Sequence, residues 1–145
     1  MCLFTIQKRT VVLGVVLALA SVPMRLSAQG SEAGVIVYLD PMTTAGVGGT
    51  VNLAPNGQAT NFDVTLNPGD SGDQNGAYKL RVVEGSCSKP GAVVQDINEV
   101  HADGKARREG GNLRLSDVRR GDHVIQVAAK HRNEVVACGM IPAAR

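Results

Sequence analysis

The sequence predicts an all-β protein, a Greek-key antiparallel sandwich or barrel that follows a cleaved N-terminal signal helix. Three observations support this fold class. About eight short segments of alternating or apolar character follow one another at roughly even spacing. Turn residues such as Asn56-Gly57 and Gly121-Asp122 separate these segments. No segment after the N-terminal one shows the apolar period of a helix, and the chain contains no internal repeat.

The N-terminal segment, residues 1–28, is expected to be a secretory signal peptide. Lys8 and Arg9 precede an uncharged apolar run over residues 11–22, and Ala28 offers a small residue for cleavage. The run is shorter than the roughly 20 residues that a membrane-spanning helix needs, which argues against an anchor. We therefore expect a secreted or periplasmic protein with one domain over residues 29–145 and no stable membrane span after cleavage.

The first half of the domain is expected to contain four strands, at residues 34–39, 49–54, 59–66 and 77–83. The second and third alternate in polarity, and Asn56-Gly57 between them is a strong signal for a hairpin. Phe62, Val64 and Leu66 would share one face of the third strand, because successive side chains point to opposite sides. A loop rich in Gly and Asp over residues 67–76 separates the third strand from the fourth.

The second half is expected to contain four more strands. One lies within residues 92–100 after a turn at Lys89-Pro90-Gly91, and a short one lies at 113–115 after a turn at Asp103-Gly104. Residues 116–118 are expected to form one helical turn. The last two strands, at 123–128 and 134–141, are joined by a turn at Arg132-Asn133.

The charge of the domain does not indicate a nucleic-acid-binding protein. Removal of residues 1–28 leaves 12 of the 15 basic residues against 13 acidic ones. All of these basic residues lie within 79–145, whereas 29–78 contain only acidic ones. The simpler interpretation is two differently charged faces of one domain; the alternative is a basic patch that meets an anionic surface. Such a patch would consist of Lys105, Arg107, Arg108, Arg114, Arg119 and Arg120.

Two cysteines remain after cleavage of the signal peptide, Cys87 and Cys138. An exported chain with an even pair of cysteines most simply forms a disulfide. On the chain-entropy account, a bond that closes a loop of this length contributes about 4 kcal/mol to stability. A metal site built on these cysteines is not expected, since neither has a CxxC partner or a histidine cluster nearby.

The segments around both cysteines resemble a known family. Residues 137–141, Ala-Cys-Gly-Met-Ile, resemble the Ala-Cys-Gly-Val-Ile terminus of copper–zinc superoxide dismutases. Glu-Gly-Ser-Cys at 84–87 and Pro-Gly-Ala-Val-Val at 90–94 are similar to a pattern in short secreted bacterial proteins of that type. The resemblance covers residues 38–141. It implies the Greek-key sandwich of these dismutases and a disulfide between Cys87 and Cys138.

The residues at the expected ligand positions depart from this family. Aligned through residues 84–87, the paired copper-binding histidines fall on Arg81 and Val83, and the third copper ligand falls on Ala128. The catalytic arginine of the family falls on Val135, and the zinc-binding loop has no counterpart. Copper needs imidazole or thiolate ligands, and an arginine cannot ligate because it stays charged. The resemblance therefore implies the fold and argues against dismutase activity.

Other sites of chemistry are not evident. His101, His123 and His131 could share a metal only if the fold brought them together, and we expect solvated or edge histidines instead. For Arg81, the alternatives are a residual anion-binding concavity and, more simply, an ordinary exposed arginine. We expect no catalytic residue, cofactor or metal. The sequence thus indicates a non-catalytic binding or structural module of the cell envelope; the alternative is a copper-binding protein or a dismutase-type enzyme with a non-standard site.

Overall fold

The computed structural model describes residues 33–67, 69, 76–101, 105–109 and 113–144. These residues form eight strands and one short helix. In chain order the elements are β1 (Val35–Pro41), β2 (Gly48–Asn56), β3 (Ala59–Asn67), β4 (Ala77–Gly85), β5 (Pro90–His101), β6 (Lys105–Glu109), α1 (Leu115–Val118), β7 (His123–Ala129) and β8 (Val135–Met140). The expected signal peptide and the expected turn at Asp103-Gly104 lie outside the described residues.

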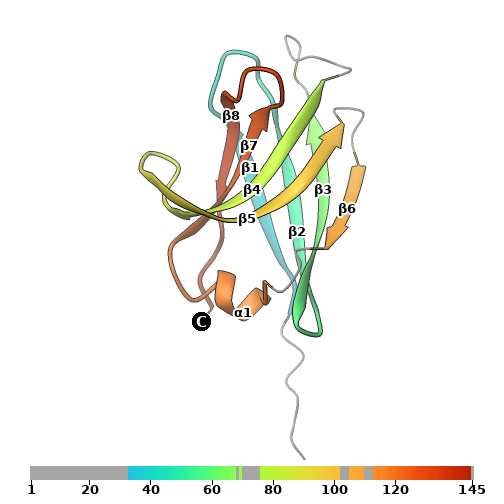
Figure 1. Ribbon diagram of the computed structural model, residues 1–145, viewed down its shortest axis with the longest axis vertical. Helices are drawn as coiled ribbons and strands as arrows, with labels where there is room; N and C mark the ends of the chain where they lie inside the picture. Colours follow the sequence, from blue (N-terminus) through green and yellow to red (C-terminus); the bar gives the residue numbers. More distant parts are fainter. Residues whose placement is uncertain (1–32, 68, 70–75, 102–104, 110–112, 145) are drawn as a thin grey trace, which may run out of the picture.

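The eight strands form one antiparallel sheet in the order β5-β4-β7-β8-β1-β2-β3-β6. The sheet curls into a half-barrel, so that its two end strands, β5 and β6, come into contact (Figure 1). The strands of the N- and C-terminal ends are neighbours, because β8 lies between β7 and β1. The all-β antiparallel class predicted from the sequence is thus confirmed.

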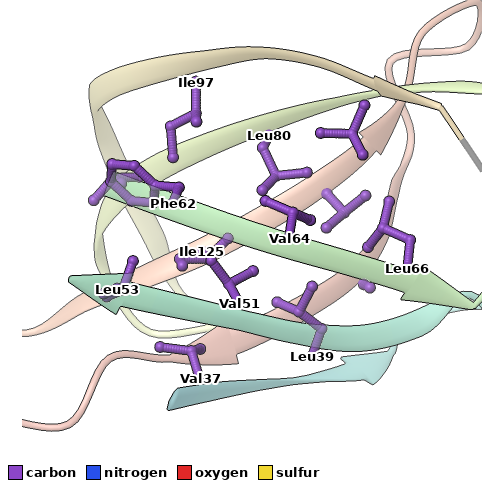
Figure 2. Packing of buried hydrophobic residues seen from close by; sticks show 14 of the residues in the cluster. Val37, Leu39, Val51, Leu53, Phe62, Val64, Leu66, Leu80, Ile97 and Ile125 are labelled. Carbon is purple, nitrogen blue, oxygen red and sulfur yellow. The ribbon is translucent and has the colours of Figure 1, made fainter. Parts of the chain in front are cut away.

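The hydrophobic core fills the inside of the curled sheet. Phe62, Val64 and Leu66 of β3 alternate with more exposed residues, as their spacing predicted, and all three are buried. Figure 2 shows them facing Leu80 and Ile97 across the core. Valine and leucine suit these positions because their side chains pack well on a pleated, half-buried surface.

The β2–β3 hairpin confirms the strongest turn prediction. Asn56 pairs with Ala59, which leaves Gly57 and Gln58 as a two-residue loop. Gly57 has a φ of 60°, the left-handed conformation that a tight hairpin turn requires and that glycine adopts without a steric penalty. This turn fixes the register of the hairpin and therefore the face on which the β3 residues are buried.

Two local predictions in the second half were wrong. The short strand expected at 113–115 is absent: Leu115 instead begins α1, in which Leu115 and Val118 are buried at one end of the core. Their spacing suits one helical turn better than a strand. The sixth strand is β6, whose sequence, KARRE, shows no apolar alternation. The turn after β4 lies at 86–89, and Pro90 already belongs to β5. The helical turn predicted at 116–118 is present in α1.

Candidate functional site

The candidate site is the outer face of β4, on the side of the sheet away from the core. Tyr78, Leu80 and Val82 point into the main core. Val83 belongs instead to a second, smaller cluster, with Val124 and Cys138. Since side chains alternate along a strand, Arg81 lies on the same outer face as Val83, as their spacing predicted.

The neighbouring strand β7 supplies the next side chains of this face. Arg81 is paired with Gln126 and Val83 with Val124, while Ala128 is paired with Lys79. Arg81, Val83 and Ala128 therefore share one face, but Gln126 is the residue directly opposite Arg81. Sequence reasoning missed Gln126. The available signal was a single amide in an otherwise apolar segment, VIQVA, after His123.

The outer face carries a row of side chains around Arg81 that are polar except for the disulfide-bonded Cys138. Following the register from strand to strand, the row runs Asp96, Arg81, Gln126, Cys138 and Asp40. Gln126 is only 4% exposed, which is unusual for an amide side chain. Arg81 is half-buried rather than exposed, and its Nε is buried with no hydrogen-bond partner among the described residues. An unpaired buried donor costs free energy of folding, so this atom is a place where an acceptor would be favourable.

The Cys87–Cys138 disulfide joins the β4–β5 turn to β8 and confirms the predicted pair. The two Cα atoms are 5.8 Å apart, within the usual range for a disulfide. The turn is closed by two backbone hydrogen bonds between Ser86 and Lys89, with N–O distances of 3.1 and 3.2 Å. Cys87 packs against Val83, Val124 and Cys138, so the turn is fastened onto the outer face.

The three histidines lie at three different places in the fold. His101 ends β5, His123 begins β7, and His131 lies in the β7–β8 turn. Within the described part of the chain, no group of three His, Cys, Asp or Glu side chains is placed to hold a metal ion. The Nδ1 atom of His123 is buried and has no hydrogen-bond partner in that part. Val135, at the expected position of the catalytic arginine, begins β8.

The basic residues proposed as a patch occupy two regions. Lys105, Arg107 and Arg108 belong to β6, and Arg114, Arg119 and Arg120 flank α1. Among the three whose side chains the structure describes, Arg119 and Arg120 contact neighbouring residues. Arg119 donates hydrogen bonds to the carbonyl oxygens of Pro142 and Ala143, at 3.1 and 3.3 Å. Arg120 forms an ion pair of 2.8 Å with Asp117.

Two concavities lie beside the first half of β4. The larger, of about 220 Å³, is lined by Lys79, Leu80, Asp96 and Glu99 on the side of β5. The smaller, of about 80 Å³, lies beside the β7–β8 turn and includes Tyr78, Val47, Lys130, His131 and Arg132 in its lining. Lys130 bonds both carboxylate oxygens of Glu99, at 2.8 and 2.9 Å. This hydrogen bond and the nearby positive charges lower the pKa of Glu99.

Comparison with known proteins finds no matching family model, no matching curated protein and no matching solved structure. The helices of the described residues include none with the length and apolar character needed to cross a membrane.

Proposed function

We propose that the protein is an exported, non-catalytic β-sandwich module with a binding or structural role in the cell envelope. We further propose that its fold is the Greek-key sandwich of the copper–zinc superoxide dismutases. The strand order supports this: β4, β5 and β6 follow one another, β5 contacts β6, and β7 returns to lie beside β4. With β5 and β6 counted as neighbours, this order resembles the Greek-key pattern.

The observation that carries the functional proposal is the composition of the outer face of β4. Arg81, Val83 and Ala128, at the positions where the resemblance expects copper ligands, share this face and lie beside the disulfide that the resemblance also implies. A guanidinium, an isopropyl group and a methyl group offer no lone pair to copper. Our proposal is thus that the chain keeps the frame of this family around a face with different chemistry.

Metal titration tests this proposal. The purified, metal-stripped protein is titrated with Cu²⁺ and with Zn²⁺ by calorimetry, and superoxide dismutation is assayed with and without each metal. We expect neither tight stoichiometric binding nor activity. As a matched control, a variant with His101→Ala, His123→Ala and His131→Ala should give the same titration curves. Stoichiometric copper together with dismutase activity in the unmodified protein would overturn the proposal.

The alternative function is copper binding or dismutase-type catalysis at a non-standard site. One observation favours it: the Nδ1 atom of His123 is buried without a hydrogen-bond partner among the described residues, and a metal would satisfy it. The single variant His123→Ala separates the two functions. Loss of tight copper binding in this variant alone supports the alternative, whereas equal weak binding in both proteins supports the non-catalytic module.

A further inference from the structure

Two neighbouring polar side chains on the outer face of the sheet have no hydrogen-bond partner among the described residues. Gln126 is almost fully buried, and its amide bonds with no other described residue. Arg81 lies opposite it in the register of β4 and β7, and the Nε atom of Arg81 is buried and unpaired in the same part of the chain. Buried polar groups of folded proteins nearly always have partners. Two unpartnered neighbours on one face therefore favour a ligand that would pair with both.

The disulfide accounts for the burial of Gln126 on the face away from the core. Cys138 lies beside Gln126 on β8, in direct register. Because β7 lies between β4 and β8, the bond from Cys138 to Cys87 brings the β4–β5 turn across β7. Cys87 packs there against Val124, which precedes Gln126 on the same face. The amide is thus shielded from water, and electrostatic interactions are stronger in such a place than on an open surface.

The charges around Arg81 leave a small positive excess. Lys79 lies on the same face of β4, and Asp96 lies opposite Arg81 on β5. Neither of these two residues, nor Arg81, forms an ion pair with another described residue. Glu99 and Lys130 bond to each other and neutralise their charges. Two unpaired cations against one unpaired anion suit a ligand with a single negative charge better than a more highly charged phosphate group.

We propose that Arg81 and Gln126 form a binding site for the carboxylate group of a small organic acid. The Nε–H and one terminal N–H of a guanidinium form a planar fork that matches the two oxygens of a carboxylate. The side-chain amide of Gln126, directly opposite, supplies a further donor. This inference rests on the proposed function, because it assigns a ligand class to the face that carries the proposed binding role.

The larger concavity gives room for the rest of the ligand. Its lining includes Leu80, which precedes Arg81, and Asp96, which lies opposite Arg81 in the sheet. The register of β4 against β5 shifts between Lys79 and Arg81. Irregularities of this kind are frequent beside active sites, because they redirect side chains. The volume of about 220 Å³ lies below the usual range for drug-sized ligands, so a small acid fits better than a large one.

Titration with sodium acetate, followed by nuclear magnetic resonance, tests the site. The Nε–H group of Arg81 gives a nitrogen–hydrogen signal of its own, and so does the side-chain amide of Gln126. In the oxidised, unmodified protein at constant ionic strength, we expect both signals to follow one saturable binding curve. Sodium phosphate at the same concentrations should bind more weakly, because of its higher charge.

Four variants separate the fork from simple charge, and circular dichroism checks that each is folded. Arg81→Lys keeps the charge but removes the fork, so it should weaken acetate binding roughly tenfold or more, the loss expected for one charge-assisted hydrogen bond. Gln126→Glu places an acceptor opposite Arg81 within the chain and should abolish binding. Asp96→Asn removes a repelling charge and should tighten binding. Arg114→Gln is the matched control, because Arg114 is exposed and its side chain makes no capping hydrogen bond to α1.

Three results would overturn the inference. They are an Arg81 signal that does not shift up to about 100 mM acetate, equal affinity for acetate in folded Arg81→Lys and Arg114→Gln, and tighter binding of phosphate than of acetate. The metal titration fails or succeeds separately. Stoichiometric copper with dismutase activity would overturn the proposed function whatever acetate does, whereas a failed acetate titration would leave a non-catalytic module without this ligand.

Discussion

Gly139 shows how one residue can determine whether two strands meet. A Cβ atom at this position of β8 would lie 2.1 Å from the carbonyl oxygen of Tyr38 on β1. That oxygen belongs to the backbone, so it cannot move aside as a flexible side chain would. Only a glycine allows β8 and β1 to approach this closely.

The corresponding prediction concerns Gly139→Ala. We expect this change to lower the free energy of unfolding by roughly 3 kcal/mol, the upper part of the usual range for overpacking. Urea denaturation followed by circular dichroism measures it. Gly121→Ala is the matched control, because its Cβ would meet only the His123 ring, at 3.3 Å. Equal stability losses in the two variants would contradict the importance of the β1–β8 contact.

For single residues, the sequence predicted which face of a strand a side chain occupies better than it predicted which residue lies opposite on the neighbouring strand. The common face of Arg81 and Val83 follows from the two-residue period of a strand, which local sequence fixes. The pairing of Arg81 with Gln126 depends on how β4 and β7 align, and they are separated by two other strands and a helix along the chain. Long-range register is set by the whole packed sheet, and the amide was therefore missed.

Among the elements, the β4–β5 turn has an unusual position because the disulfide holds it on the outer face of the sheet. Below it lie Val83 and Val124, which are buried although they point away from the main core. The element thus creates a second apolar cluster on a face that would otherwise meet solvent. Loss of the bond would release the turn and expose these valines.

We predict that replacing both cysteines, Cys87→Ser with Cys138→Ser, lowers the free energy of unfolding by about 4 kcal/mol, since the bond closes a loop over 51 positions. Thermal and urea denaturation of the variant and of the oxidised protein measure the difference. Reduction of the unmodified protein is a second route to the same state. A loss below about 1 kcal/mol by both routes would show that the turn stays in place without the bond.

The elements that the sequence mispredicted are those with the weakest patterns. β6 has almost no apolar residues, and pairing with β3 alone defines it as a strand. Leu115 was assigned to a strand because it alternates with Leu113. In the structure it forms α1 instead, in which Leu115 and Val118 are both buried. In both places tertiary contacts override local preference, as they often do in short segments.

For the molecule as a whole, acid stability involves Glu99, which links β5 to the β7–β8 turn through Lys130. The pKa of Glu99 is lowered, mainly by its hydrogen bond with Lys130. A carboxylate with a lowered pKa in the folded state stabilises the fold above its unfolded-state pKa. This contribution disappears as the pH falls through the lowered value.

We therefore predict that Glu99→Gln lowers stability at neutral pH and that the two proteins converge in stability below the lowered pKa. Lys130→Gln should flatten the acid limb in the same way, because it removes the partner that lowers the pKa. Urea midpoints between pH 2 and pH 7 give the comparison, with the exposed Glu84→Gln as control. A constant difference between Glu99→Gln and the unmodified protein at every pH would be inconsistent with this linkage.

The overall class could be read from the sequence because seven of the eight strands have recognisable apolar patterns and turn residues between them. The curling of the sheet, the contact of β5 with β6, and the burial of Gln126 could not be read in this way. They arise when strands far apart in the chain come together, and no local pattern encodes that arrangement.

The position of β8 between β7 and β1 has a consequence for synthesis, which proceeds from the N-terminus. Until residues 135–140 have emerged, the chain can form only two separate sheets, β5-β4-β7 and β1-β2-β3-β6. β7 and β1 would then each present an open edge, and Cys87 could not yet bond with Cys138. Of the eight described strands, the one that joins the halves comes last in sequence, so the sheet is completed only after residues 135–140 are available.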